Sequence, residues 1–368
     1  MRIGDREIGL DHPPYVIAEI GVNHDGEVDR ALELTDAAAD AGADAVKLQY
    51  FETDRLMSRA AKLAAYQKAA GETDPISMLR RLELNLDEMS QVVDRAHERG
   101  IHAIVTVFST ELVDAAETLA WDAYKTASPD IVNKPLLDRL CDTGKPMIVS
   151  TGASTLDEVV RAVGWLESVR DRLVVLQCVS SYPTPDEQAS YGGIQAICEA
   201  TDLPVGYSDH TRSEYTSERA VYCGAVLLEK HFTWRKKAAG PDHAASLEAD
   251  EFKIYTNAAK SITSRVHSPK WQLEQEKNGP IVMDVEIGGI CKVVLDCERD
   301  VRDVSRQSVV GIGAVPAGTV IGREHLTIKR PGTGILAYRL EDVIGRTAAR
   351  DIEGDVPIVE EDVIGGLA

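Results

Sequence analysis

Residues 15–50 read YVIAEIGVNHDGEVDRALELTDAAADAGADAVKLQY, and this stretch decides the fold. It begins with an apolar, β-rich run at Tyr15–Gly21 and ends with a second one at Asp44–Tyr50. Between them, apolar residues recur at helical spacing over 29–41, and Gly42 follows as a helix-ending glycine. The stretch therefore predicts a strand, a helix and a second strand, which is the repeating unit of parallel sheets.

The same unit recurs along most of the chain. Eight β-rich runs alternate with helical runs, at Tyr15–Gly21, Asp44–Tyr50, Ile101–Phe108, Trp121–Ser128, Pro146–Gly152, Leu173–Ser180, Pro204–His210 and Ala225–Thr233. Eight such units in about 250 residues favour an α/β fold of the (β/α)8 TIM-barrel type. A doubly wound sheet is the alternative, and it is less favoured because no G-x-G-x-x-G follows the first strand.

Three parts follow from this pattern. We expect a catalytic barrel over 1–265, a linker over 266–304 and a small β-rich domain over 305–368. Residues 53–85 form an oversized insertion after the second strand, and we expect helices there that cover the barrel mouth. Within the linker, Ile281–Ile287 and Ile290–Leu295 are able to pair as short strands.

The composition excludes several classes of partner. The chain has 368 residues, and its 60 acidic and 40 basic residues give a formal net charge of −20. Binding to nucleic acid or to an anionic membrane needs a surplus of Lys and Arg, so neither partner is expected. No apolar run is long enough to span a bilayer, and residues 1–7 lack the apolar core of a signal peptide, so we expect a cytoplasmic protein. The acidic surplus also fits a salt-rich cytoplasm.

Two lysines stand inside apolar strands, where an unpaired charge is costly. Lys47 lies in Val-Lys-Leu and Lys125 in Tyr-Lys-Thr, both near the carboxyl ends of their strands. Chemistry gathers at this end of a barrel, and Ser128 and Ser150 follow nearby. The pattern favours a bound phosphate or carboxylate, with structural ion pairs as the alternative.

Two histidines end neighbouring strands. His210 and His231 are expected to converge across the barrel mouth beside Glu229 and Asp209. The pair favours a divalent metal such as Mn²⁺, Fe²⁺, Co²⁺ or Zn²⁺ over satisfied core histidines. Asp242, on the loop after the last strand, faces the same mouth or is a simple turn residue.

These segments also resemble a known family. The matching motifs are IAEIGVNHDG (17–26), VKLQ (46–49), STG (150–152), YPTP (182–185), GYSDHT (206–211), EKHFT (229–233), GPDH (240–243) and KRPGTG (329–334). In this order they are similar to the N-acetylneuraminate (sialic acid) synthase family, and the last one resembles its C-terminal antifreeze-like (β-clip, SAF) domain. The resemblance covers nearly the whole chain.

The resemblance implies a reaction and a set of site residues. Members join phosphoenolpyruvate to the open-chain aldehyde of an N-acylhexosamine, with a divalent metal, and release a nine-carbon 2-keto acid and phosphate. The metal is expected to be Mn²⁺, with Mg²⁺ or Co²⁺ as alternatives, held by His210 and His231. The implied catalytic residues are Glu19, Lys47, Lys125 and Asp242. The implied substrate-binding residues are Gln49, Thr106, Ser128, Asp130, Ser150, Ser180, Tyr182, Ser208, Glu229 and Arg330.

The resemblance also implies a domain-swapped homodimer, in which Arg330 reaches the N-acyl group in the neighbouring subunit's barrel. One departure concerns the sugar, because residues 125–130 read KTASPD where the family usually has K-I-x-S-G-E. N-acetylmannosamine, a 2,4-diacetamido-6-deoxy hexose that leads to legionaminic acid and a spore-coat-type precursor all stay open. The rival functions are a Schiff-base aldolase that uses Lys125 or Lys230, and a non-catalytic protein that binds sugar phosphates.

Overall fold

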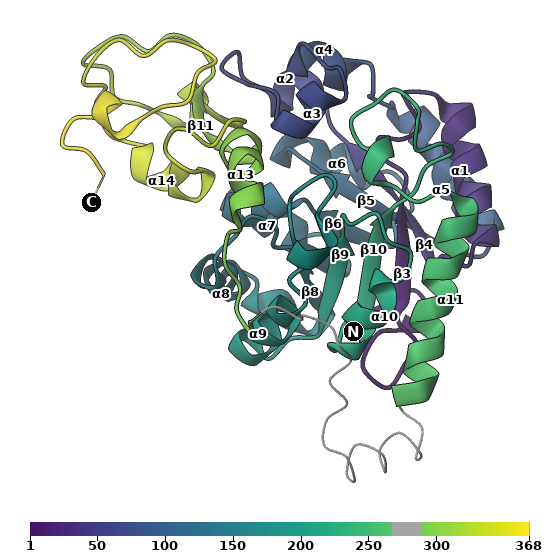
Figure 1. The fold of residues 1–368 in the computed structure, drawn as a ribbon. Helices are drawn as coiled ribbons and strands as arrows, with labels where there is room; N and C mark the ends of the chain where they lie inside the picture. The colour runs from purple at the N-terminus through teal and green to yellow at the C-terminus, as the bar shows by residue number, and fades with distance from the viewer. Residues whose placement is uncertain (267–288, 368) are drawn as a thin grey trace.

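The computed structural model describes residues 1–266 and 289–367, and its centre is a closed barrel (Figure 1). Eight parallel strands follow each other in the order β10-β3-β4-β5-β6-β7-β8-β9. Their bounds are Tyr15–Glu19 (β3), Ala45–Tyr50 (β4), His102–Val107 (β5), Ala123–Thr126 (β6), Met147–Ser150 (β7), Leu173–Cys178 (β8), Val205–Asp209 (β9) and Leu227–His231 (β10). All eight lie in the runs expected from the sequence, and the TIM-barrel prediction is confirmed.

Helices surround the barrel. They are α1 (Val28–Asp40), α5 (Leu86–Glu98), α6 (Val113–Ala116), α7 (Lys134–Cys141), α8 (Leu156–Trp165), α9 (Gly192–Thr201), α10 (Thr216–Tyr222) and α11 (Ala249–Val266). At the start of α8, Thr155 and Glu158 form a capping box, in which each side chain bonds the other's backbone N–H. None of the helices among the described residues is long and apolar enough to cross a membrane.

The N-terminal end of the barrel is closed by apolar packing. The hairpin of β1 (Arg2–Ile3) and β2 (Arg6–Glu7) brings Ile3 and Ile8 against the lower barrel core. That core is built from strand residues such as Ile17, Ile104 and Leu227, all fully buried. Polar chemistry is therefore left to the opposite, carboxyl end of the strands.

The insertion after β4 covers that carboxyl end, as expected. It holds three short helices, α2 (Thr53–Leu56), α3 (Ala65–Ala69) and α4 (Pro75–Arg80), above the barrel in Figure 1. Leu56 and Met78 pack with Phe51 and Phe108 in one apolar cluster. This cluster fixes the insertion to the ends of β4 and β5.

After the gap in the described residues, the chain runs along the barrel to the C-terminal domain. A 3₁₀ turn at Asp296–Glu298 and helix α13 (Arg299–Ser305) lie on this path. Ile290–Leu295, which the sequence allowed as a short strand within the linker, forms no strand, and Ile281–Ile287 lies outside the described residues. Residues 289–306, called the strap below, are held to the barrel by polar contacts rather than by strand pairing.

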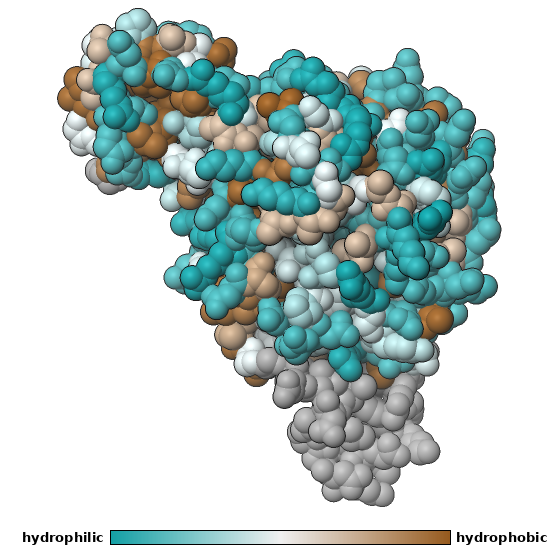
Figure 2. All heavy atoms as spheres, turned by 45° about the horizontal axis from the view of Figure 1, so that its top comes forward, coloured by the Kyte–Doolittle hydropathy of each residue, from teal (hydrophilic) through white to brown (hydrophobic). Residues whose placement is uncertain are grey.

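The C-terminal domain is small and β-rich, as predicted. Strands β11 (Ser308–Gly311) and β12 (Leu326–Lys329) pair antiparallel, and α14 (Leu340–Val343) is a single turn. The domain has its own apolar core, which includes Val309 and Ile358. Apolar side chains also gather on the surface of this domain in Figure 2, and its exposed apolar residues include Ile312, Val320 and Ile364.

In the single chain described, this domain packs on the chain's own barrel. The backbone of Arg330 pairs with the insertion, since its N–H donates to Leu56 O at 2.9 Å and its carbonyl accepts from Ser58 N at 3.0 Å. Asn133 Nδ2 donates to Gln307 Oε1 at 2.5 Å, which ties the domain to the start of α7. The Arg330 side chain is thereby aimed at the barrel mouth.

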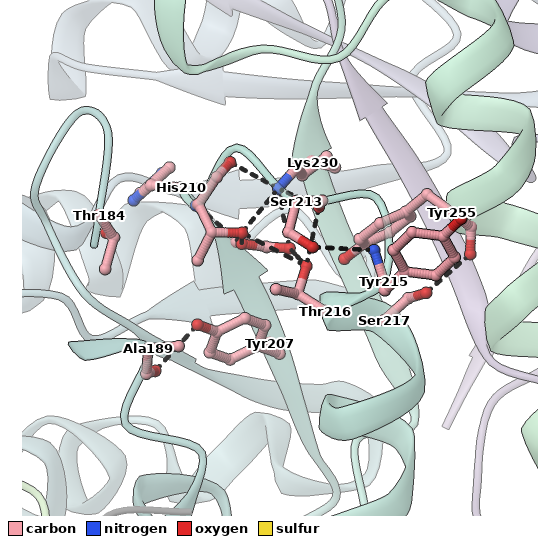
Figure 3. A network of polar contacts seen from close by, with 12 residues as sticks. Thr184, Ala189, Tyr207, His210, Ser213, Tyr215, Thr216, Ser217, Lys230 and Tyr255 are labelled. Atoms are coloured by element: carbon pink, nitrogen blue, oxygen red, sulfur yellow. Dashed lines mark hydrogen bonds and ion pairs between the residues drawn. The ribbon is translucent and has the colours of Figure 1, made fainter. Parts of the chain in front are cut away.

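Successive side chains of a strand point to opposite faces, so some lysines of the barrel point into its interior and others point toward the surrounding helices. Lys230 and Asp209 are register partners on β10 and β9. The Lys230 side chain points outward, beside Ser213 in Figure 3, and its Nζ lies 5.4 Å from the centre of the Tyr255 ring on α11. Lys230 Nζ lies 2.9 Å from Asp209 Oδ2 and donates to Thr211 O at 2.7 Å, and both charged side chains are fully buried. Lys230 is therefore a structural residue of the barrel wall.

We predict that Lys230→Met lowers the free energy of unfolding by about 3–5 kcal/mol, because it leaves the carboxylate of Asp209 buried without its cation. Urea unfolding followed by circular dichroism measures the change. Lys236→Met is the matched control, since its ion pair with Glu251 is partly exposed and is worth at most about 1 kcal/mol. Equal losses in both variants would contradict a structural role for the buried pair.

Candidate active site

One cavity opens at the carboxyl end of the barrel, under the insertion and beside the C-terminal domain. Fourteen of the sixteen predicted site residues line it: Glu19, Lys47, Gln49, Thr106, Lys125, Ser128, Ser180, Tyr182, Ser208, His210, Glu229, His231, Asp242 and Arg330. Ser150 and Asp130 are fully buried beside the cavity but do not line it. Lys230 does not line it either, and this geometry argues against Lys230 as a Schiff-base nucleophile.

The two lysines predicted from the sequence meet carboxylates inside the cavity. Lys47 Nζ contacts Glu19 Oε2 and lies 3.4 Å from Glu229 Oε1, while Lys125 Nζ lies 3.1 Å from Glu229 Oε2. Lys47 also donates to Thr106 Oγ1 at 3.1 Å. The lysines are thus members of buried ion pairs, which was the alternative, and they also line the cavity, so the binding of a phosphate or carboxylate stays a prediction.

Burial controls the protonation of this cluster. Burial lowers the pKa of Lys47 to about 7, although Glu229 opposes the shift. Burial alone would raise the pKa of Glu229, but the charges of Lys125 and Lys47 outweigh it and bring that pKa to about 2. The carboxylate of Glu229 is therefore ionised, and it keeps two cations in the cavity.

Three serine hydroxyls gather where β6, β7 and β8 end. Ser128 Oγ donates to Ser150 Oγ at 3.0 Å and accepts from Gly152 N at 2.9 Å. A Cβ on Gly152 would lie 2.0 Å from Ser180 Oγ and 2.7 Å from Ser128 Oγ, so only glycine allows the hydroxyls to come this close. Ser150 thus supports Ser128 from behind instead of facing the cavity.

The two histidines face one another, with ring centroids 5.4 Å apart. His210 Nδ1 lies 2.8 Å from Val179 O, and this carbonyl fixes the proton on Nδ1 and leaves the Nε2 lone pair free. His231 Nδ1 is buried and has no hydrogen-bond partner among the described residues, with Asp242 Oδ2 at 3.9 Å. Tyr182 stacks on His210 at 4.1 Å between centroids.

This donor set fits a divalent metal with two protein ligands. A free imidazole lone pair and an unpartnered buried imidazole nitrogen meet at the same cavity, and both are common metal ligands. No group of three or more His, Cys, Asp or Glu side chains is arranged to hold a metal within the ranges that the structure describes. A metal bound here would take its remaining ligands from substrate and water.

Asp242 lines the cavity, so it is more than a turn residue. Burial raises its pKa to about 6, against the opposing charges of His210 and Lys47. Its loop is anchored by the next residue, His243, whose Nε2 lies 2.8 Å from Asp25 Oδ1 and whose Nδ1 lies 2.7 Å from Thr233 Oγ1. The GPDH and NHDG motifs are therefore in direct contact.

Arg330 enters the cavity from the C-terminal domain. Its guanidinium lies 5.4 Å from the centre of the Phe108 ring, and its Nε has no hydrogen-bond partner within the described part of the chain. Asp130 stands behind this face of the cavity and accepts from Ala127 N at 3.1 Å. Burial raises the pKa of Asp130 to about 7, although the charge of Arg330 opposes this.

Several lining residues were missed by the sequence analysis. Tyr66 and Gln67 come from helix α3 of the insertion, and the Tyr66 ring lies 4.8 Å from that of Tyr182. Val301 and Ser305 come from helix α13 of the strap. The only signal for the first pair was the length of the insertion, and nothing in the sequence marked the second.

Comparisons with known proteins agree with this geometry. The family model described as the NeuB family matches residues 34–269, and the SAF domain model matches 306–364. The N,N'-diacetyllegionaminic acid synthase of Campylobacter jejuni is 34% identical, over 94% of this chain and 98% of that protein. The N-acetylneuraminate-9-phosphate synthase of Mus musculus is 30% identical, over 97% and 95%.

A solved structure supports the same assignment. The spore coat polysaccharide biosynthesis protein spsE from Bacillus subtilis superposes with a TM-score of 0.83 at 28% identity, and the match covers 99% of both chains. The fold of the barrel and of the C-terminal domain is therefore shared along nearly the full length of both chains. This chain belongs to the NeuB family of synthases and is an enzyme with a C-terminal SAF domain.

Proposed function

We propose that this enzyme condenses phosphoenolpyruvate with the open-chain aldehyde of an N-acylhexosamine, with the help of a divalent metal. The products are a nine-carbon 2-keto sugar acid and phosphate. One observation carries the proposal: two buried lysines and two facing histidines line a single cavity at the barrel mouth. The names of the relatives, which are synthases of legionaminic and neuraminic acids, support the same reaction class.

The lysines would hold phosphoenolpyruvate. In a chain with a net charge of −20, a trianionic substrate needs a local cationic pocket. Lys47 and Lys125 provide it, and the hydroxyls of Thr106, Ser128 and Ser180 line the same cavity. Charge-assisted hydrogen bonds of this kind are worth about 1.5–3 kcal/mol each.

Glu19 is the residue we assign to the reacting carbon. As C3 of the enol attacks the aldehyde, positive charge develops at C2, and water must add there before phosphate leaves. Glu19 is fixed by Gly21 N, which donates to its Oε1 at 2.8 Å, and by the contact with Lys47. A fixed carboxylate stabilises the developing charge and takes the proton from the incoming water.

His210 and His231 would hold the metal, and Mn²⁺ is our first choice, with Mg²⁺ or Co²⁺ as alternatives. When bound, a divalent metal supplies Lewis-acid polarisation of the aldehyde oxygen. Tyr182 packs against both imidazoles and keeps them in place. Asp242, 3.9 Å from His231, faces the same part of the cavity and is suited to a sugar hydroxyl.

For the sugar we propose a 2,4-diacetamido-6-deoxy hexose of the legionaminic type, ahead of N-acetylmannosamine. The legionaminic acid synthase from C. jejuni is the more similar of the two curated relatives described, at 34% against 30% identity. The guanidinium of Arg330 would bind an N-acyl carbonyl in the cavity. The deciding experiment is a phosphate-release assay with phosphoenolpyruvate and a panel of N-acylhexosamines, with and without Mn²⁺.

Release that requires both substrates and the metal would support the proposal. No release with any hexosamine would favour a non-catalytic binding protein. An adduct with a keto substrate that borohydride traps on Lys125 would instead favour a Schiff-base aldolase.

We expect His210→Ala and His231→Ala each to abolish turnover and to leave the fold intact, because each removes one of two protein ligands. Metal analysis of the purified variants, together with circular dichroism, measures both effects. His97→Ala is the control, since this histidine pairs with Asp122 at the surface. Full metal occupancy with normal turnover in either site variant would refute the metal assignment.

We expect Lys47→Met to raise the KM for phosphoenolpyruvate by on the order of tenfold to a hundredfold, because one charge-assisted contact of about 1.5–3 kcal/mol is lost. Steady-state kinetics with saturating sugar measures the change, and Lys134→Met, which removes an exposed helix pair with Asp138, is the control. An unchanged KM with a lower melting temperature would show that Lys47 has only a structural role.

We also propose that the active form is a domain-swapped homodimer, in which the contacts that the C-terminal domain makes here serve the partner's barrel. Arg330→Ala is then expected to weaken the sugar far more than phosphoenolpyruvate. Mixing this variant with Glu19→Ala is expected to restore part of the activity, because a hybrid dimer pairs one intact barrel with one intact Arg330. Demonstrated subunit exchange without any restored activity would show that the domain serves its own barrel.

A further inference from the structure

The strap carries a glutamate that is completely buried against the barrel. Glu298 has no exposed surface, and its Oε1 accepts two backbone hydrogen bonds, from Ala153 N at 2.6 Å and from Ser180 N at 2.7 Å. Its Oε2 accepts from Leu295 N at 2.9 Å, within the strap itself. One carboxylate oxygen thus joins two barrel loops that are separate in the sequence.

Those loops border the serine cluster of the cavity: Ser180 lies on the second loop, and the first loop contacts Ser128, which follows β6. Ala153 follows Gly152, whose N–H bonds Ser128 Oγ, and Ala153 has a left-handed backbone with φ of 51°. Such a conformation is unfavourable for alanine and persists only where neighbours hold it. Ser180 is itself a lining residue, and its N–H is one of the two that Glu298 binds.

Without Glu298, the two backbone N–H groups would lose their shared acceptor, although Arg302 and Arg306 would still donate to the carbonyl of Ala153. Two buried N–H groups would be left without an acceptor, which is unfavourable. The loops would relieve this cost by moving, and the space around Gly152 is too tight to absorb movement, since Ser180 and Ser128 are packed against it. A shift at Ala153 or Ser180 is therefore transmitted to the serine hydroxyls.

The strap does not need Glu298 for its attachment. Arg302 and Arg306 both bind the carboxylate of Glu158, with N–O distances of 2.7–2.9 Å. Lys292 Nζ donates to Cys178 O at 3.1 Å. These contacts do not involve Glu298, so we expect the strap to stay attached when Glu298 is substituted. An effect of the substitution on the barrel loops is then distinct from detachment of the strap.

We propose that Glu298 is a positioning residue for the phosphate of phosphoenolpyruvate. It holds the loops after β7 and β8 so that the Ser180 hydroxyl on the second loop faces the cavity, together with the Ser128 hydroxyl that Gly152 of the first loop contacts. This inference rests on the proposed function. It gives the C-terminal part of the chain a role toward both substrates, since the strap orders the phosphate side of the cavity and Arg330 enters from the sugar side.

The test compares Glu298→Ala, Glu298→Asp and Glu298→Gln with the control Asp296→Ala, an exposed residue of the same 3₁₀ turn. Steady-state kinetics gives the KM for each substrate, and calorimetry gives the Kd for phosphoenolpyruvate. We expect Glu298→Ala to raise the KM and Kd of phosphoenolpyruvate about tenfold or more, with the sugar KM changed less than twofold. Glu298→Gln is expected to restore most of the affinity, because its amide oxygen still accepts from both N–H groups.

Glu298→Asp covers the case in which the alanine variant does not fold. Its shorter side chain cannot reach both amides, so it is expected to weaken phosphoenolpyruvate as well. Equal increases in both KM values would mean that the whole domain has detached, and unchanged KM values with a lower melting temperature would mean a structural role; either result overturns the inference. A wild-type enzyme that binds no phosphoenolpyruvate would refute the proposed function itself, and the inference with it.

Discussion

The rest of the cavity depends on ion pairing among four buried charged side chains at the barrel mouth. Lys47 and Lys125 would be expensive to bury alone, and Glu19 and Glu229 equally so, but together they form a neutral group. The pairing keeps both cations in place without substrate. An incoming anion competes with Glu19 and Glu229 for these two lysines.

The alternation of side chains along each strand decides which charges take part. Glu229 points into the barrel and contacts both cavity lysines, while its neighbour Lys230 points outward and pairs with Asp209. A shift of one residue in β10 would exchange these two side chains. The register of β10 therefore decides that Glu229 lies in the cavity and that Lys230 lies between the barrel and its helices.

This periodicity also explains how far the sequence could be interpreted. The eight strands were visible because buried parallel strands are continuous apolar runs, and a lysine or histidine at the end of such a run is conspicuous. The insertion was visible only as extra length, so Tyr66 could not be singled out. Ser150 was assigned to the right cluster, but its place behind Ser128 depends on loop packing that no pattern reports.

The strap was the hardest segment to interpret. Its mixed charges are typical of a solvated linker, and Glu298 is indistinguishable in sequence from the exposed Asp296 two residues earlier. What buries Glu298 is the presence of two unpaired backbone N–H groups on barrel loops far away in the chain. Local sequence does not encode such a partner, because it is created only when β7 and β8 are already side by side.

The strap is joined to the C-terminal domain by a very short connection, and this limits how the active site can be assembled. Helix α13 ends at Ser305 and β11 begins at Ser308, so Glu298 and Arg330 belong to one continuous unit. If the C-terminal domain crossed to a partner's barrel, Glu298 and Arg330 would therefore cross together. The carboxylate would then bind the loops after β7 and β8 of that barrel, and the guanidinium would enter the same barrel's cavity. In either arrangement a barrel without a docked C-terminal unit lacks the Glu298 carboxylate on the loops after β7 and β8 and the Arg330 guanidinium in the cavity. If the proposed roles of these two residues hold, docking of this unit completes the cavity for both substrates at once, which would tie assembly of the protein to formation of its active site.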